Sequence, residues 1–173
     1  SDKPKNPETS GFKAEQSRTS HTLTLNGKAL AYQAEAGTLV VSPKDPMDMN
    51  DNKSDSDKDD KPEALMSYVA YTLGKDVDAK RPIMFVFNGG PGSASIWLHM
   101  GSFGPKRVDI PADRNAGGAP YSLVDNADTI LTATDLVFVD APGTGFGHLR
   151  GKDADHLFLG IDGDAATMAR FIL

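Results

Sequence analysis

The chain contains no cysteine in its 173 residues, which excludes disulfide bonds and thiolate metal sites. It has no run of about 18 continuous apolar residues, so we expect no membrane-spanning helix and no membrane partner. Lys and Arg number 18 against 24 Asp and Glu, for a net charge of −6, and they form no cluster. Because a phosphate-binding surface needs clustered basic residues, we expect no nucleic-acid partner.

The first twenty residues contain few apolar side chains to bury, and we expect residues 1–20 to form a flexible lead-in. They also lack the basic-then-apolar order of a signal peptide. This indicates either a cytoplasmic protein or one whose leader has been removed. The remaining length fits one domain with a sizeable core.

Acidic residues and lysines dominate residues 45–63, DPMDMNDNKSDSDKDDKPE, and predict a solvated, mobile loop. Three positions alternate as in an EF-hand calcium loop: Asp48, Asn50 and Asn52. However, Lys53 stands where that loop needs glycine, and Asp59 stands where it needs a bidentate glutamate. A solvated loop is therefore favoured over a metal site.

Alternating apolar and polar residues predict the first strands. Asn26-Gly27 separates two such runs, which predicts a β-hairpin with strands near residues 21–25 and 28–34. The run GTLVV continues the second strand or opens a third. Further strands are predicted at MSYVAYTL, RPIMFVF and DLVFVD. The last two are almost entirely apolar, as in strands buried on both faces.

The rest of the pattern predicts helices and surface chain. IWLHMG predicts a short helix, and residues 104–130 predict a long irregular segment. The final run, DGDAATMARFIL, predicts a helix that covers the sheet. Its expected apolar face consists of Ala165, Met168, Ala169 and Ile172. The helix has no stop residue before the chain ends, so the sequence looks cut. The order of elements favours an α/β fold with a mixed sheet and functional loops at the carboxyl ends of its strands.

Two glycine-rich turns, NGGPG and APGTGFG, follow the two most apolar strands. Ser93 and Ser95 come after the first turn, but neither lies in the G-x-S-x-G elbow of an α/β-hydrolase nucleophile, and no such elbow occurs elsewhere in the chain. A role at a helix N-terminus is favoured for both serines. The spacing also fits neither phosphate-binding motif. An oxyanion hole built from backbone N–H groups and a purely structural turn remain as alternatives.

Three blocks of the chain resemble the serine carboxypeptidase family of the α/β-hydrolase clan, particularly its bacterial branch. The blocks are FNGGPGSAS, GSFGPKRV and NADTILTATDLVFVDAPGTGFG. Their order and spacing match over residues 81–147, and weaker similarity runs from 21 to the end. The resemblance implies that residues 21–173 form the N-terminal part of an α/β-hydrolase-like mixed sheet with helices, preceded by the antiparallel hairpin. It also implies a serine-type carboxypeptidase that acts through an acyl-enzyme without a metal or organic cofactor.

The resemblance assigns roles at the matching positions. The Gly90 N–H would be an oxyanion-hole donor. Asn88 and the Gly89 backbone would bind the free carboxylate of the substrate peptide. Asp140 and the turn that follows it would line and support the same cleft.

Two positions depart from the family pattern, and the catalytic triad is missing. Val86 stands where many members have tryptophan, and Ser102 stands where many have glutamate, which bears on acidic pH preference and carboxypeptidase specificity. The nucleophile, aspartate and histidine of the family lie beyond the matching region, so we expect the chain alone to be inactive. The four histidines have no serine elbow to serve and are expected to be surface or packing residues: His21, His99, His148 and His156.

The resemblance therefore implies two partners, a peptide with a free C-terminus and the missing C-terminal half of the enzyme. A periplasmic or secreted location follows from the same family. An incomplete sheet is expected to leave an open edge and uncovered apolar strands. Two alternatives remain: a proline-releasing aminopeptidase, whose corresponding loop is His-Gly-Gly-Pro-Gly, and a non-catalytic binding module that keeps the cleft.

Overall fold

The computed structural model describes residues 11–43, 61–74, 78–90, 92–110 and 121–173. Most of the acidic segment 45–63, with every position considered for calcium, lies outside the described residues. The strands are β1 (Gln16–Leu25), β2 (Lys28–Val41), β3 (Glu63–Leu73), β4 (Ile83–Val86), β5 (Lys106–Val108), β6 (Leu123–Asp125), β7 (Asp135–Asp140) and β8 (His148–Arg150). The helical segments are α1 (Ile96–Leu98), η2 (His99–Phe103), η3 (Ile130–Thr132), α2 (Ala154–Phe158) and α3 (Ile161–Ile172).

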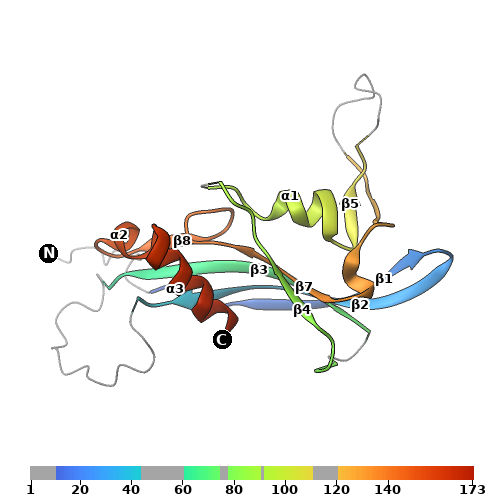
Figure 1. Ribbon diagram of the computed structural model, residues 1–173, viewed down its shortest axis with the longest axis horizontal. Coiled ribbons are helices and arrows are strands. Elements are labelled where there is room, and N and C mark those ends of the chain that lie inside the picture. Colours follow the sequence, from blue (N-terminus) through green and yellow to red (C-terminus); the bar gives the residue numbers. More distant parts are fainter. Residues whose placement is uncertain (1–10, 44–60, 75–77, 91, 111–120) are drawn as a thin grey trace, which may run out of the picture.

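The main sheet is mixed and mostly antiparallel. Its strand order is β1-β2-β3-β7-β4, with β8 also paired to β3. Only β4 and β7 run parallel. In Figure 1, α1 and η2 lie on one face of this sheet, and α2 and α3 lie on the other. The chain therefore has an α/β fold with a mixed sheet and few helices, which confirms the expected class at this level.

The predicted hairpin is present as β1 and β2. Asn26 and Gly27 both have positive φ angles, 48° and 73°, which is the backbone that a two-residue hairpin turn requires. Strand β1 begins at Gln16, so the prediction that residues 1–20 are a flexible lead-in is wrong from residue 16 onward. Residues 16–20 pair with residues 33–37 of β2 while their side chains stay exposed. Backbone pairing, which needs no apolar side chains, extends the strand beyond what composition predicts.

Strand β7 is the centre of the core. All six of its residues are buried, which confirms the prediction of a buried strand. Leu136 and Phe138 face α1 and η2 in a cluster with Tyr71 of β3. Val137 and Val139 face α2 and α3 in a second cluster. The alternation of the strand thus supplies both layers of the core.

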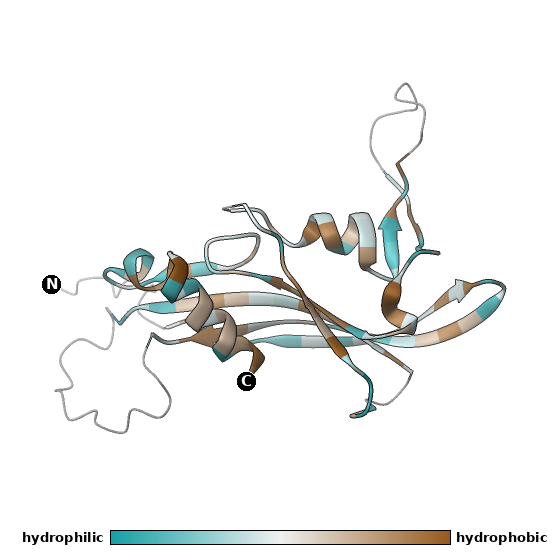
Figure 2. Cartoon of the chain, in the orientation of Figure 1, coloured by the Kyte–Doolittle hydropathy of each residue, from teal (hydrophilic) through white to brown (hydrophobic). Residues whose placement is uncertain are grey.

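Strand β4, in contrast, is not buried on both faces as its sequence predicts. Ile83 is 57% exposed, Met84 is 42% exposed, and Phe87 just after the strand is 54% exposed. Strand β4 is the last strand of the sheet and pairs only with β7. Figure 2 shows the hydrophobic colouring of β4, of which Phe85 packs against Phe171 of α3. The expected open edge is therefore β4.

The helix α3 buries a different face from the one predicted. Thr167 is fully buried, and Met168 and Phe171 pack against the sheet, whereas Ala165, Ala169 and Ile172 are exposed. The rotation of the helix follows from its contact with α2. Gly163 lies so close to the Leu157 carbonyl that a Cβ there would collide with it. Backbone contact between two helices, rather than apolar periodicity, therefore orients α3.

The segment expected to be irregular contains a second, two-stranded sheet formed by β5 and β6. Asn126 is buried and donates from Nδ2 to the carbonyls of Ser102, at 2.6 Å, and Gly104, at 2.8 Å. Asp125 forms an ion pair with Lys106 and accepts a hydrogen bond of 2.8 Å from the Thr24 N–H. These polar contacts hold the small sheet in place, and the bond to Thr24 ties it to the end of β1. The pattern of apolar residues in the sequence could not predict them. None of the described helices has the length and apolar character needed to cross a membrane.

Candidate functional site

The two glycine turns lie at the same edge of the sheet. Strands β4 and β7 are parallel, with Val86 paired to Phe138, so both strands end at one edge. Asn88 and Gly89 follow β4 after one intervening residue, Phe87, and the second turn begins directly after Asp140. The expectation that both turns occupy the carboxyl ends of strands is therefore confirmed, and the structure adds that the two strands are neighbours.

The first turn has open space around Gly89 but little space around Gly90. Gly89 and Gly90 are exposed, and a Cβ on Gly89 would meet nothing within 4 Å. A Cβ on Gly90, however, would lie 2.9 Å from the Gly92 nitrogen and 3.1 Å from the Ser93 nitrogen. Gly92 has a φ angle of 87°, which favours glycine. The backbone thus folds back on itself with room for glycine only. Pro91 lies outside the described residues.

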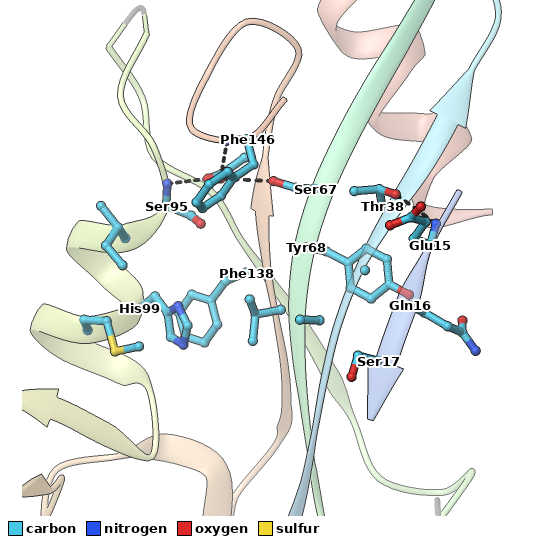
Figure 3. A pocket seen from close by; sticks show the side chains of 16 residues that line it. Glu15, Gln16, Ser17, Thr38, Ser67, Tyr68, Ser95, His99, Phe138 and Phe146 are labelled. Carbon is cyan, nitrogen blue, oxygen red and sulfur yellow. Dashed lines mark hydrogen bonds between the residues drawn. The ribbon is translucent and has the colours of Figure 1, made fainter. Parts of the chain in front are cut away.

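Asp140 joins this turn to the second one. Its side chain is buried, and Oδ1 accepts a hydrogen bond of 2.8 Å from the N–H of Ser95, just before α1. Oδ2 accepts hydrogen bonds from the Ser67 hydroxyl, at 3.1 Å, and from the Phe146 N–H, at 3.3 Å. Figure 3 shows these three contacts converging from separate parts of the chain. One carboxylate therefore fixes the start of α1, the second turn and β3 relative to one another.

Close packing of the second turn reinforces this connection. Gly145 has a φ angle of 52°, and a Cβ there would collide with Asp140 Oδ2 and lie 3.1 Å from the Ala94 Cβ. Thr144 closes the turn with a hydrogen bond of 2.9 Å from its Oγ1 to the Ala141 carbonyl. The second turn is therefore packed against Ala94, in the segment that follows the first turn. Glycine at position 145 is required for that contact.

The two serines near the first turn do not act as side chains in this network. Ser95 is buried at the N-cap position of α1, as expected, but its hydroxyl makes no capping hydrogen bond. The Ser95 N–H makes the contact to Asp140 instead. Ser93 is half-buried beside Gly90. The sequence predicted the position of the helix start but not the partner of its first N–H.

The histidines divide into one core residue and three surface residues. His99 is buried, stacks on Phe138 with ring centroids 4.6 Å apart, and has Nε2 2.6 Å from the Tyr71 hydroxyl. Burial lowers the pKa of His99 to about 4, although the nearby Asp140 carboxylate opposes that shift. A histidine with so low a pKa is a weak base at neutral pH. Its place in the core fits the expected packing role. The surface residues are His21, His148 and His156.

A cavity of about 580 Å³ lies beside these turns, between α1 and the strands β1 to β3. Ser95, Asp140 and Phe146 line it, so it adjoins the network described above. Figure 3 shows Ser95 and His99 on one wall and Thr38 and the start of β1 on the other. Asn88, Gly89 and Gly90 are not among its lining residues. The sequence did not predict this cavity, because its walls come from segments far apart in the chain.

Sequence reasoning also missed Ser67 and the Phe146 N–H as partners of Asp140. Ser67 lies 73 residues from Asp140, and only the pairing of β3 with β7 brings the two together. The Phe146 N–H is a backbone group, which no residue type identifies. Among the described residues, no cluster of three or more His, Cys, Asp or Glu side chains could hold a metal ion.

The fold and these contacts define an α/β protein in which two glycine turns meet at the carboxyl edge of a parallel strand pair. No protein-family model matches the chain, and no curated protein matches it. The interpretation of the site therefore depends on its geometry and on the quoted sequence blocks.

Proposed function

We propose that this chain is the N-terminal part of a serine-type carboxypeptidase of the α/β-hydrolase clan. The observation that carries the proposal is the hydrogen bonding of Asp140 to Ser95 and Phe146, which fixes the segment just after the first glycine turn against the second turn. A fixed backbone loop is what an oxyanion hole requires, since its donors must be in place before charge develops. The complete enzyme would be periplasmic or secreted.

The proposed roles follow from what the loop exposes. Gly90 has no side chain over its exposed N–H, which would donate to the oxyanion of the acyl intermediate. Asn88 is half-buried, and its side chain makes no hydrogen bond to another described residue, so its amide remains available for a substrate carboxylate. Gly89 is exposed and would add its backbone to the same carboxylate site. Asp140 is a positioning residue, because it acts through the two turns.

The chemistry would be completed by a nucleophile and a base from outside this chain. Nucleophilic attack needs a serine within reach of both a histidine and the oxyanion donors. Among the described residues, the serine or threonine hydroxyl that the structure places beside a histidine is Thr19 Oγ1, 2.7 Å from His21 Nε2 on the exposed strand β1. That pair lies on β1, at the opposite edge of the sheet from β4 and its loop. Strand β4 ends the sheet, so its open edge could pair with a second polypeptide segment beside the loop.

The departures from the family pattern leave the proposed carboxylate site without an acid pair. Val86 is buried in the core cluster around Phe138, and the Ser102 carbonyl accepts from Asn126. Neither position can supply an ionisable group. Asn88, rather than the histidine of the proline-releasing aminopeptidases, favours the carboxypeptidase over that alternative.

The test combines this chain with the polypeptide that its gene encodes beyond Leu173. The assay follows release of C-terminal residues from N-blocked dipeptides. We expect Asn88→Ala to raise KM for dipeptide acids more than for the corresponding amides. We expect Gly90→Ala to lower kcat/KM for acids and amides alike, because its Cβ would press on the backbone of Gly92 and Ser93 and displace the loop. Thr132→Ala, exposed on η3, is the matched control and should change neither.

Three outcomes would contradict the proposal. The first is a folded, complete protein that releases no C-terminal residue. The second is an Asn88→Ala variant with equal effects on acids and amides, which would remove Asn88 from carboxylate recognition. A complete protein that binds dipeptide acids without cleaving them would instead be the non-catalytic module.

A further inference from the structure

The cavity beside α1, called here the α1 cavity, has the size and the walls of a ligand site. Its volume of about 580 Å³ lies within the range of small-molecule sites, which runs from roughly 300 to 1,000 Å³. Helix α1 and η2 form one wall, and the strand face around Phe138 forms the floor. The apolar residues that line it are Ala36, Val69, Ile96, Met100, Phe138 and Phe146.

The two buried titratable groups of the α1 cavity, Asp140 and His99, are already engaged. Asp140 accepts from three donors, one of which is the Ser67 hydroxyl. His99 Nε2 is paired with the Tyr71 hydroxyl, and its low pKa keeps the ring neutral at pH 7. Glu15 lines the cavity from the exposed segment before β1. An anionic ligand group inside would lose hydration without gaining a cationic partner, because no described Lys or Arg lines the cavity. A cationic group would find a carboxylate at the exposed Glu15, whereas an apolar group would gain by leaving water.

The α1 cavity also shares residues with the proposed carboxylate-binding loop. Ser95 and Phe146 line the cavity, and both donate backbone hydrogen bonds to Asp140. Phe146 is 77% exposed, and Figure 3 shows it on the same side of the cavity as Ser95 and Ser67. A ligand bound at the edge of the sheet would therefore find this apolar space directly beside the turns.

We propose that the α1 cavity is a side-chain subsite of the peptide substrate and selects an apolar side chain, such as leucine, phenylalanine or methionine. This inference rests on the proposed function, because it assumes a peptide held by the Asn88 to Gly90 loop. It adds the substrate class, which the loop by itself does not determine.

The test measures binding by the 173-residue chain, without any chemistry. The ¹⁵N-labelled chain is titrated with N-acetyl-alanyl-leucine, with the lysine and aspartate analogues, and with the leucine amide. The amide resonances of Ser95 and Phe146 report on the α1 cavity. We expect the leucine acid to bind at least about tenfold more tightly than the lysine or aspartate acid, as burial of one apolar side chain predicts.

A matched pair of variants locates the effect. Ile96→Asp places a charge on the cavity wall at an exposed position, where the fold tolerates it. We expect it to reduce leucine binding about tenfold, to the level of aspartate. Leu123→Asp introduces the same charge at an exposed position on β6, away from the cavity, and should leave all affinities unchanged.

The outcomes separate this inference from the proposed function. Equal affinities for leucine, lysine and aspartate acids would overturn the apolar subsite, while a preference for acids over the leucine amide would keep the carboxylate site. Equal affinities for the leucine acid and its amide, with leucine still preferred, would overturn the carboxylate site and keep the subsite. If no dipeptide binds, both proposals are wrong for this chain.

Discussion

Asp140 offers the sharpest test of the site, because asparagine has nearly the same shape but a different hydrogen-bonding capacity. The carboxylate accepts backbone hydrogen bonds on both oxygens, from Ser95 on one and Phe146 on the other. In Asp140→Asn, one of these N–H groups faces an NH₂ donor and cannot turn away, whereas the Ser67 hydroxyl can rotate to accept. A buried N–H without an acceptor costs about 1–3 kcal/mol, and loss of charge assistance on the remaining bond costs about 1 kcal/mol. The expected loss of unfolding free energy is therefore about 3 kcal/mol.

Urea unfolding followed by circular dichroism measures that loss, provided that the m value is unchanged. Asp128→Asn is the matched control, because Asp128 is exposed and a surface change of this kind stays within about 0.5 kcal/mol. Hydrogen exchange should locate the effect, with faster exchange at the Ser95 and Phe146 amides in Asp140→Asn. If Asp140→Asn costs no more than the control, or if these two amides keep their protection, the carboxylate does not hold the turns together.

Three further substitutions test other parts of the structure. Burial lowers the pKa of His99 from 6.5 to about 4. Between these pH values the unfolded chain takes up a proton that the folded chain does not. The free energy of unfolding should therefore fall as pH drops from about 6.5 to 4, by up to about 3 kcal/mol. His99→Leu should flatten the pH dependence of urea unfolding over that window, and an unchanged slope, or an equal effect of His21→Leu, would contradict this. Met84→Lys charges the open β4 edge and should reduce self-association in light scattering; an equal reduction by Leu123→Lys would exclude the edge as the cause. Gly145→Ala should cost about 2–4 kcal/mol in urea unfolding, because a Cβ at this positive φ would collide with Asp140. Gly27→Ala, which has open space around it, should cost about 1 kcal/mol; equal costs would refute the close contact of Gly145 with Asp140.

Local sequence information predicted the elements whose formation is local. Asn26-Gly27 specifies its hairpin because both residues tolerate the positive φ angles of the turn. The apolar run at 135–140 specifies a buried strand because no polar side chain interrupts its centre. Position in the sheet is different: the run at β4 is equally apolar, yet strand order places it at the edge, where Ile83 and Met84 are exposed. Apolar periodicity reports which residues favour burial, not which strand ends the sheet.

The candidate site, like the fold, was predictable from the sequence only in part. The resemblance placed Asp140 beside the glycine turns, and the structure brings it there. Its partners could not be predicted, because two of them are backbone N–H groups and the third, Ser67, depends on the pairing of β3 with β7. The α1 cavity needs the packing of α1 against β1, β2 and β3, which no short segment encodes. The rotation of α3 likewise depends on the Gly163 contact with α2.

The contacts of Asp140 also determine how binding and catalysis can be separated. All three donors to its carboxylate belong to this chain, so the position of the second turn relative to the start of α1 does not depend on a nucleophile or a base. A loop that is already fixed costs little to organise when a ligand arrives. The chain should therefore bind a peptide carboxylate and an apolar side chain even where it cannot cleave the peptide. Binding by the 173-residue chain is accordingly the more direct test of the site, because loss of activity would not distinguish a disrupted loop from a missing triad.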